Sequence, residues 1–197
     1  MNISSHPISI IYDLIGSLGE DYRFNFSRYF YRPQSPLDER EVFSVQGNDI
    51  NDDWLTDQFS RLRDGWELAL NSEVIDSRNR RYHIPMIDFY GRRTDFLLSP
   101  YFRSMVGHRF HSMMSIFDSG RSYHAYAPIL MSNKEWIGFM GALLLLTLPD
   151  SPPVIDVRWV GHRLIGGYSA LRWSCNSSHY LAYPELVPLS KIALDQA

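Results

Sequence analysis

The stretch FDSGRSYHAYAPILMSNKEW, residues 117–136, decides the predicted fold because it joins a turn, a strand and a helix start. Its DSG segment (118–120) is typical of a sharp reversal, since Gly tolerates positive φ and Asp and Ser bond locally. The residues that follow suit a half-buried strand, on which Ser122 and His124 share one face. A hydroxyl and an imidazole are therefore presented together, directly after the basic turn residue Arg121.

Ser132 and Glu135 predict the start of a helix after this strand, since their types and spacing match a capping box. The helix continues through an almost entirely apolar segment, 136–148, which indicates burial. Its apolar run of twelve residues is too short to span a bilayer, which needs about 20. No secretion leader is recognisable at Met1, and the lone Cys175 forms neither an internal disulfide nor a Cys-rich zinc module. We therefore expect a cytoplasmic protein with no membrane contact.

The rest of the chain predicts an α+β domain with a palm-like mixed or antiparallel sheet and helices packed on one face. Residues 1–76 form an acidic N-terminal extension, a helix and strand portion of the same domain, and residues 77–197 form its core. The remaining expected elements are a short helix or strand over 6–19, a strand over 21–33 ended by Pro33 and Pro36, a helix from 52 to about 71, a strand over 84–90, mostly helix over 100–117, a strand over 154–159, turns at the glycines of 161–167 and a strand over 168–174.

Charge is distributed unevenly along the chain. Residues 1–76 hold 14 Asp and Glu against six Arg, a net of −8, whereas residues 77–183 hold 12 Arg and Lys against six Asp and Glu, a net of +6. The chain has 17 Arg and only two Lys, which favours bidentate phosphate contacts, although a GC-rich genome produces the same bias. We expect a polyanion partner for the basic part and a protein partner for the acidic part. The arginines expected to contact nucleic acid are Arg92, Arg93, Arg158 and Arg172.

Two aspartates lie in apolar segments that otherwise predict strands. Asp88 follows the apolar run 84–87 and Asp156 lies within 154–159. A carboxylate there is costly to bury unless a metal, an arginine or a backbone amide binds it. For Ser122 and His124 the alternative is that both are ordinary hydrogen-bonded polar groups on a sheet.

Two histidines offer a separate possibility. His108 and His111 are three residues apart, a spacing at which both could bind one metal ion. With Asp88 they would form a metal-dependent hydrolase site, and surface or packing histidines are the alternative.

The order of these segments resembles the catalytic core of archaeo-eukaryotic primases and primase-polymerases over residues 81–183. The matching motifs are IDFY (87–90), SYH (122–124) and ID (155–156). The resemblance implies that Ser122 and His124 contact the triphosphate of an incoming nucleotide. It also implies that Asp88 and Asp156 hold Mg²⁺ or Mn²⁺. Phosphoryl transfer further needs cationic donors on the phosphates, for which Arg121 and Arg163 join His124 as candidates.

One position departs from the family pattern. Tyr90 stands where the family has its second acid, and a neutral phenol cannot replace a carboxylate on a hard cation. We therefore expect a primase-polymerase-like protein that binds nucleoside triphosphates, DNA or RNA, with two outcomes open. Either Asp88, Asp156 and His124 catalyse metal-dependent nucleotidyl transfer in replication, repair or defence, or the chain is an inactive scaffold. Such a scaffold would serve as an interaction subunit of a nucleoprotein or anti-phage assembly.

Overall fold

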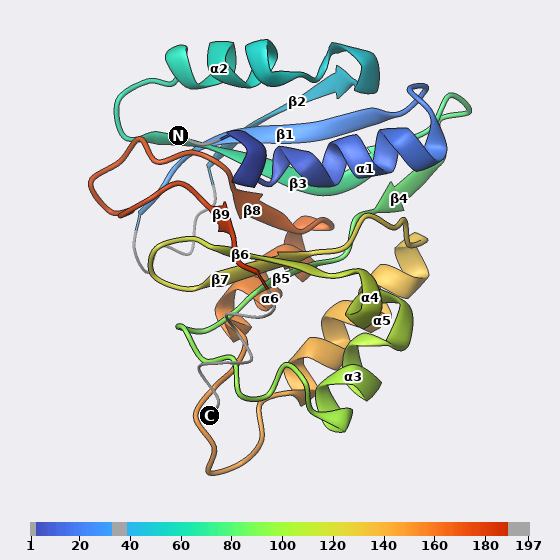
Figure 1. Ribbon diagram of the computed structural model, residues 1–197, viewed down its shortest axis with the longest axis vertical. Coiled ribbons are helices and arrows are strands. Elements are labelled where there is room, and N and C mark those ends of the chain that lie inside the picture. Colours follow the sequence, from blue (N-terminus) through green and yellow to red (C-terminus); the bar gives the residue numbers. More distant parts are fainter. Residues whose placement is uncertain (1–2, 33–38, 189–197) are drawn as a thin grey trace.

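The computed structural model describes residues 3–32 and 39–188, so the predicted strand end at Pro33 and Pro36 lies outside the described residues. Two antiparallel sheets form its framework (Figure 1). The five-stranded sheet has the order β2-β1-β3-β4, with β8 also paired to β3, and comprises β1 (Arg23–Phe30), β2 (Arg40–Gln46), β3 (Trp66–Ile75), β4 (Arg81–His83) and β8 (Ala170–Arg172). The four-stranded sheet has the order β5-β7-β6-β9 and comprises β5 (Met86–Asp88), β6 (Ser115–Asp118), β7 (Tyr123–Tyr126) and β9 (Glu185–Leu186).

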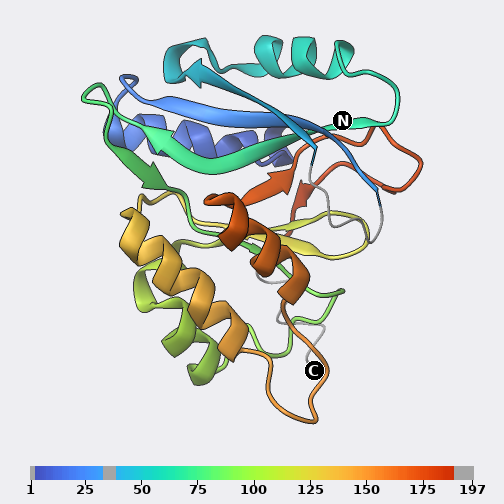
Figure 2. The same ribbon diagram turned by 180° about the vertical axis from the view of Figure 1, so that it is seen from behind.

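Helices cover both sheets, which confirms the predicted α+β class. α1 and α2 lie beside the five-stranded sheet, whereas α3, α4 and α5 lie beside the four-stranded sheet, as the two opposite views show (Figures 1 and 2). None of the helices in the described part of the chain has the length and apolar character needed to cross a membrane. The α-helices are α1 (Ile8–Leu18), α2 (Asp52–Ser60), α3 (Pro100–Val106), α4 (His108–Met113), α5 (Asn133–Leu145) and α6 (Val157–Gly166), and the 3-10 turns are Ile3–Ser5 and Gly47–Asp49.

The four-stranded sheet is buried on both faces, and the alternation of side chains along β5 shows how. Ile87 and Phe89 point into a core shared with α3, α4, α5 and α6. Met86 points the other way, into a second core that holds α1 and the apolar face of the five-stranded sheet. Asp88 lies on the same side of β5 as Met86, because successive strand residues alternate between faces. The sheets therefore meet across the face that carries Asp88.

Two local predictions are confirmed. Ser132 accepts a hydrogen bond from the backbone N–H of Glu135, and the Glu135 carboxylate accepts one from the N–H of Ser132, so the capping box opens α5. The reversal before β7 contains Gly120 with φ of +93°, a conformation that side chains other than Gly rarely adopt.

The predicted helix from 52 to about 71 is wrong beyond Ser60. The chain turns at Gly65 (φ +75°), where an added Cβ would lie 2.9 Å from the ring of Phe30. β3 then runs from Trp66 to Ile75 and pairs with β1, β4 and β8. From Trp66 onward the apolar residues also alternate with period two, at Trp66, Leu68 and Leu70, and pairing with three strands decides between the two structures.

The predicted strand over 154–159 is also wrong, and so are the predicted turns at Gly161 and Gly166, which lie within α6. Ile155 makes a single bridge to Phe89, and the chain then enters α6. Asp156 is the N-cap of this helix, because its Oδ1 accepts hydrogen bonds from the N–H groups of Arg158 and Trp159. Gly167 ends the helix in the left-handed region, with φ of +78°. An Asp cap and a Gly end were both visible in the sequence.

The structure also differs from the predictions in the segment 100–117 and at the edge strand β2. The helical region predicted over 100–117 is two helices, α3 and α4, separated by Gly107 with φ of +83°, and it gives way to β6 at Ser115. β2 was not predicted. It is an edge strand that pairs with β1 over Arg40–Gln46.

Candidate functional site

A cleft of about 370 Å³ lies where β5, β7 and β8 meet the start of α6. The end of β1 and the segment that follows β8 also line it. A more open hollow of about 500 Å³ lies elsewhere, lined by residues that include Glu20, Asp21 and Asp76. It contains none of the predicted site residues, and Asp76 already pairs with Arg80. The cleft is therefore the candidate functional site.

Most of the predicted site residues line this one cleft, although they come from four separate parts of the chain. Arg92 and Arg93 are not among its lining residues. Those that line it are Asp88, Arg121, Ser122, His124, Asp156, Arg158, Arg163 and Arg172.

The two aspartates lie side by side. The backbone N–H of Asp156 donates to the carbonyl of Asp88 over 3.0 Å, and both side chains line the cleft. Burial and, next, the charge of Asp156 raise the pKa of Asp88 to about 8, whereas Arg172 and a hydrogen bond from Ser122 act in the opposite direction. The site thus holds a carboxylate whose charge the protein alone does not fully compensate.

His124 is the direct neighbour of Asp88 on β7, with Nε2 3.8 Å from Oδ1. The residue is only 5% exposed, and Nδ1 has no hydrogen-bond partner within the described structure. Burial and the nearby Arg172 lower the pKa of His124 to about 3, so the imidazole is neutral at pH 7. Buried polar groups normally have partners. The residue lines the cleft while Nδ1 itself is enclosed, so a ligand would bond this atom by displacing the atoms around it.

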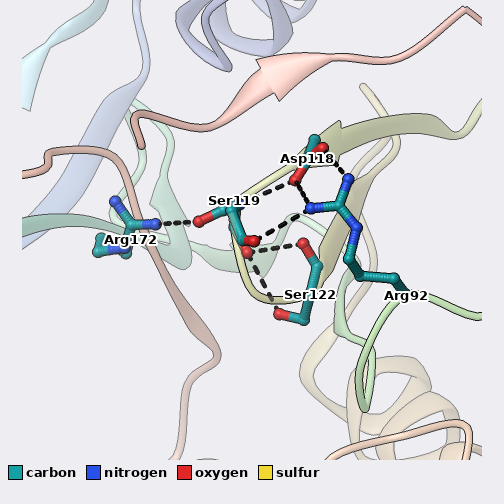
Figure 3. A network of polar contacts seen from close by, with 6 residues as sticks. Arg92, Asp118, Ser119, Ser122 and Arg172 are labelled. Atoms are coloured by element: carbon teal, nitrogen blue, oxygen red, sulfur yellow. Dashed lines mark hydrogen bonds and ion pairs between the residues drawn. The ribbon is translucent and has the colours of Figure 1, made fainter. Parts of the chain in front are cut away.

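The turn that presents Ser122 is held from both sides (Figure 3). On one side Arg92 donates to Asp118 over 2.5 Å and to the carbonyl of Gly120 over 3.0 Å. On the other side Arg172 donates to the carbonyl of Ser119 over 2.7 Å. Inside the turn, the N–H and hydroxyl of Ser119 both donate to the carbonyl of Ser122. Two arginines predicted to contact nucleic acid therefore brace this turn.

Arg172 is almost entirely occupied by the protein itself. Its side chain is buried, donates also to the carbonyls of Ser174 and Ala182, and lies 3.9 Å above the ring of Tyr180. Arg93 pairs with Asp95 at the surface, over 2.6 Å. The contacts of these arginines with nucleic acid stay predictions.

The cleft is strongly basic. It contains six arginines against two aspartates, and several of these arginines are exposed at its rim, as Arg121 and Arg158 are. Such a concentration of positive charge attracts polyanions. Sequence reasoning missed the two arginines that come from the acidic N-terminal part, since charge was counted along the chain. The six are Arg32, Arg40, Arg121, Arg158, Arg163 and Arg172.

The cleft also has an aromatic side. Its rings come from the end of β1 and from the loop after β8, more than a hundred residues apart in sequence. No local motif joins these two segments. The rings are Tyr29, Tyr31, His179 and Tyr180.

Tyr90, two residues beyond Asp88, also lines the cleft and is 58% exposed. It occupies the position where the primase resemblance places a second acid. Asp88 and Asp156 are therefore the carboxylates that the described residues contribute to the cleft.

The alternative hydrolase site on His108, His111 and Asp88 is wrong. The Nε2 of His111 is bonded to the carbonyl of Leu97 over 2.9 Å, and His108 is exposed on α4. Neither histidine lines the cleft, and the described part of the chain contains no group of three or more His, Cys, Asp or Glu that could hold a metal ion.

Comparison with known families gave one informative result. A family model described as "AEP-like: Archaeo-eukaryotic primase 1D-like" matches residues 46–185, which is 140 of the 197 residues. A search of curated proteins found no match. The matched span includes Asp88, Ser122, His124 and Asp156, whereas Tyr29, Tyr31, Arg32 and Arg40 of the cleft precede it.

Proposed function

The chain belongs to the archaeo-eukaryotic primase-like family and is a primase-polymerase-like protein, and from this premise we propose that its cleft binds the triphosphate of a nucleotide. The observation that carries the proposal is His124, a buried and neutral imidazole without a hydrogen bond on Nδ1, beside Ser122 and Asp88. A phosphate oxygen would give its ring N–H a charged acceptor.

The charges of the cleft support the same ligand. Six arginines exceed two aspartates, so the cleft attracts an anion and not a cation alone. Arg121 and Arg158 are exposed at the rim, where they can rearrange onto phosphate oxygens. Arg163, buried at the wall, contributes positive charge that solvent screens only weakly.

The family implies a divalent metal ion, and the two aspartates fit one such ion. Mg²⁺ is usually bound by one or two carboxylates together with substrate phosphates. Oδ1 of Asp156 already caps α6, which leaves Oδ2 and the carboxylate of Asp88. Burial and, next, repulsion by Asp156 raise the pKa of Asp88, and a cation there would offset the repulsion. We propose that Asp88 and Asp156 hold a single Mg²⁺ or Mn²⁺, which would neutralise phosphate charge.

The cleft offers two aspartates, which suffice for one metal ion and not for the two that catalysis by this chemistry requires. Nucleotidyl transfer by two metal ions needs converging carboxylates for both ions. Tyr90 stands where the family has its second acid, so we favour nucleotide binding with weak or no synthesis. The second candidate is therefore an inactive, nucleotide- or nucleic-acid-binding subunit of a larger assembly, in which the acidic N-terminal part would contact a protein.

Calorimetric titration of ATP in Mg²⁺ buffer tests the proposed function. Replacing His124 with Ala should weaken binding by about 1–3 kcal/mol, the range for losing a hydrogen bond to a charged group. The matched control is His108→Ala, which removes an exposed histidine outside the cleft and should leave the affinity unchanged. Failure of the unmodified chain to bind ATP, or equal ATP affinity in the chain with and without His124, would reject the proposal.

A further inference from the structure

Two rings from distant parts of the chain lie against each other in the cleft. Tyr31 follows β1, and His179 belongs to the loop that follows β8. Their ring centroids are 4.3 Å apart and their planes differ by 31°. Both side chains line the cleft and are half-buried. Aromatic residues that only fill the core are far more enclosed, as Phe26 is with no exposure at all.

The loop that carries His179 is fixed at both ends. At its start, the buried carboxylate of Glu67 accepts from the backbone N–H groups of Asn176 and Ser177, over 2.9 and 2.7 Å. At its end, Arg172 donates to the carbonyl of Ala182 over 3.0 Å. The position of His179 in the cleft is therefore set by hydrogen bonds to the buried side chains of Glu67 and Arg172 before any ligand arrives, which reduces the entropic cost of binding.

The ring of Tyr180 packs against both Tyr31 and His179. Tyr180 lies 5.5 Å from Tyr31, and its hydroxyl is 3.2 Å from the hydroxyl of Tyr29. Its ring also lies under the guanidinium of Arg172. The rings thus form one connected aromatic surface.

The aromatic surface adjoins the charged part of the cleft. The pKa of Tyr31 is raised first by burial and next by the charge of Asp156, while the positive charge of Arg121 acts in the opposite direction. The phenol of Tyr31 therefore interacts electrostatically with both the acids and the arginines of the proposed phosphate site. A ligand with phosphates at His124 and a flat group attached to them would meet both surfaces.

We propose that Tyr31 and His179 form a stacking platform for a nucleobase. This inference rests on the proposed function and adds to it the part of the ligand that the phosphate site leaves unrecognised. Stacking uses the face of the base, which all bases share, so the platform has little sequence preference. Tyr31 precedes the span matched by the family model, whereas His179 lies within it.

Four probes test the platform by separating the base from the phosphate. They are ATP, inorganic tripolyphosphate, a single-stranded oligothymidylate and an abasic oligonucleotide of the same length. The unmodified chain should bind the base-bearing member of each pair more tightly. His179→Ala and Tyr31→Leu should each weaken binding of a base-bearing probe by about 5- to 100-fold, the range for losing one stacked base. Both substitutions should leave the affinity for tripolyphosphate unchanged.

Ring-retaining variants serve as controls for folding. Tyr31→Phe and His179→Tyr keep an aromatic face at each position, so they should retain most of the affinity for the base-bearing probes. Thermal unfolding of all variants shows whether each is folded under the conditions of the titration. Loss of base-dependent binding in Tyr31→Phe as well as in Tyr31→Leu would contradict a stacking role.

The possible results separate the platform from the phosphate site. Tighter binding of ATP than of tripolyphosphate, or of the oligothymidylate than of the abasic oligonucleotide, supports the platform. The pair that shows the difference tells whether the ligand is a mononucleotide or a single strand. Equal affinity for base-bearing and base-free probes overturns the platform and leaves the phosphate site standing. Binding of none of the four probes by the unmodified chain overturns both.

Discussion

Asp88 and His124 face each other on neighbouring antiparallel strands, with the carboxylate Oδ1 and the imidazole Nε2 3.8 Å apart. The distance is that of an ion pair, but burial opposes charge on both groups. It raises the pKa of Asp88 to about 8 and lowers that of His124 to about 3, so the two are not a charged pair at pH 7. The protein keeps two polar groups here at a cost in stability, which is typical of a functional site.

Replacing Asp88 with Asn should stabilise the metal-free chain and remove any stabilisation by Mg²⁺. The amide has the shape of the carboxyl group but has no charged form, whereas burial and, next, the charge of Asp156 oppose ionisation of Asp88 and raise its pKa to about 8. We expect the free energy of unfolding at pH 7.5 to rise by about 1 kcal/mol or more in EDTA. Urea unfolding with EDTA and with Mg²⁺ measures both effects.

The control for this substitution is Asp95→Asn, at an exposed carboxylate that pairs with Arg93 on the surface. Its effect should stay within about 0.5 kcal/mol with or without Mg²⁺. A decrease of stability in Asp88→Asn measured in EDTA would contradict the cost argued for burying this carboxyl group beside Asp156.

Arg172→Ala should destabilise the fold by about 2–4 kcal/mol, because it leaves the carbonyls of Ser119 and Ser174, which make buried hydrogen bonds, without their charged donor. Arg121→Ala is the matched control, since Arg121 lines the same cleft but is exposed. It should weaken ATP binding while leaving the urea midpoint unchanged. Similar midpoints for the two variants would show that Arg172 is not the structural brace described above.

Arg92→Ala should loosen the turn before β7 with little loss of global stability, since its pair with Asp118 is partly exposed. We expect faster hydrogen exchange at the amide of Gly120, which bonds to Asp118, and ATP binding weakened by a few-fold. The neighbouring Arg93→Ala provides the comparison, because Arg93 pairs with Asp95 and not with the turn. The same exchange rates in both variants would exclude this role for Arg92.

Tyr90→Asp should raise the affinity for Mg²⁺ or Mn²⁺ by adding a carboxylate two residues from Asp88, at the wall of the same cleft. Tyr90 is 58% exposed, so the change removes little buried surface. Metal titration measures the affinity, and primer-extension and de novo synthesis assays compare catalysis. Robust metal-dependent synthesis by the unmodified chain would overturn the inference that its own site is weak or inactive.

Acid should destabilise the fold through His6. Its Nε2 bonds to the carbonyl of Trp173 and its Nδ1 accepts from the N–H of Ile8, a pattern that requires the neutral ring. Burial lowers its pKa to about 4, whereas an unfolded chain binds a proton below about 6.5. Stability should therefore fall between pH 6.5 and 4, by up to about 1.4 kcal/mol per pH unit from this group.

Urea unfolding of the chain and of His6→Gln between pH 7.5 and 4.5 measures this loss. The variant should show a shallower pH dependence, which does not vanish because His83, with a pKa also lowered to about 4, acts in the same direction. Parallel pH profiles for the two proteins would exclude His6 as a source of the acid sensitivity.

Local sequence determined those features whose interactions lie within a few residues. The capping box of α5 and the reversal at Gly120 depend on hydrogen bonds and φ values inside one turn, so residue types alone predicted them. The motif positions of Asp88, Ser122 and His124 were likewise visible, and the structure brings them into one cleft.

Tertiary structure decided the rest, because it depends on partners far away in the chain. Residues 66–75 fit helical and strand periods, and pairing with three other strands makes them β3. The cleft acquires Arg32, Arg40 and the Tyr31–His179 pair only because β1 and the loop after β8 lie together. Periodicity is a local property of the sequence, whereas the charge and the aromatic surface of a cleft arise from segments that only the packed sheets bring together.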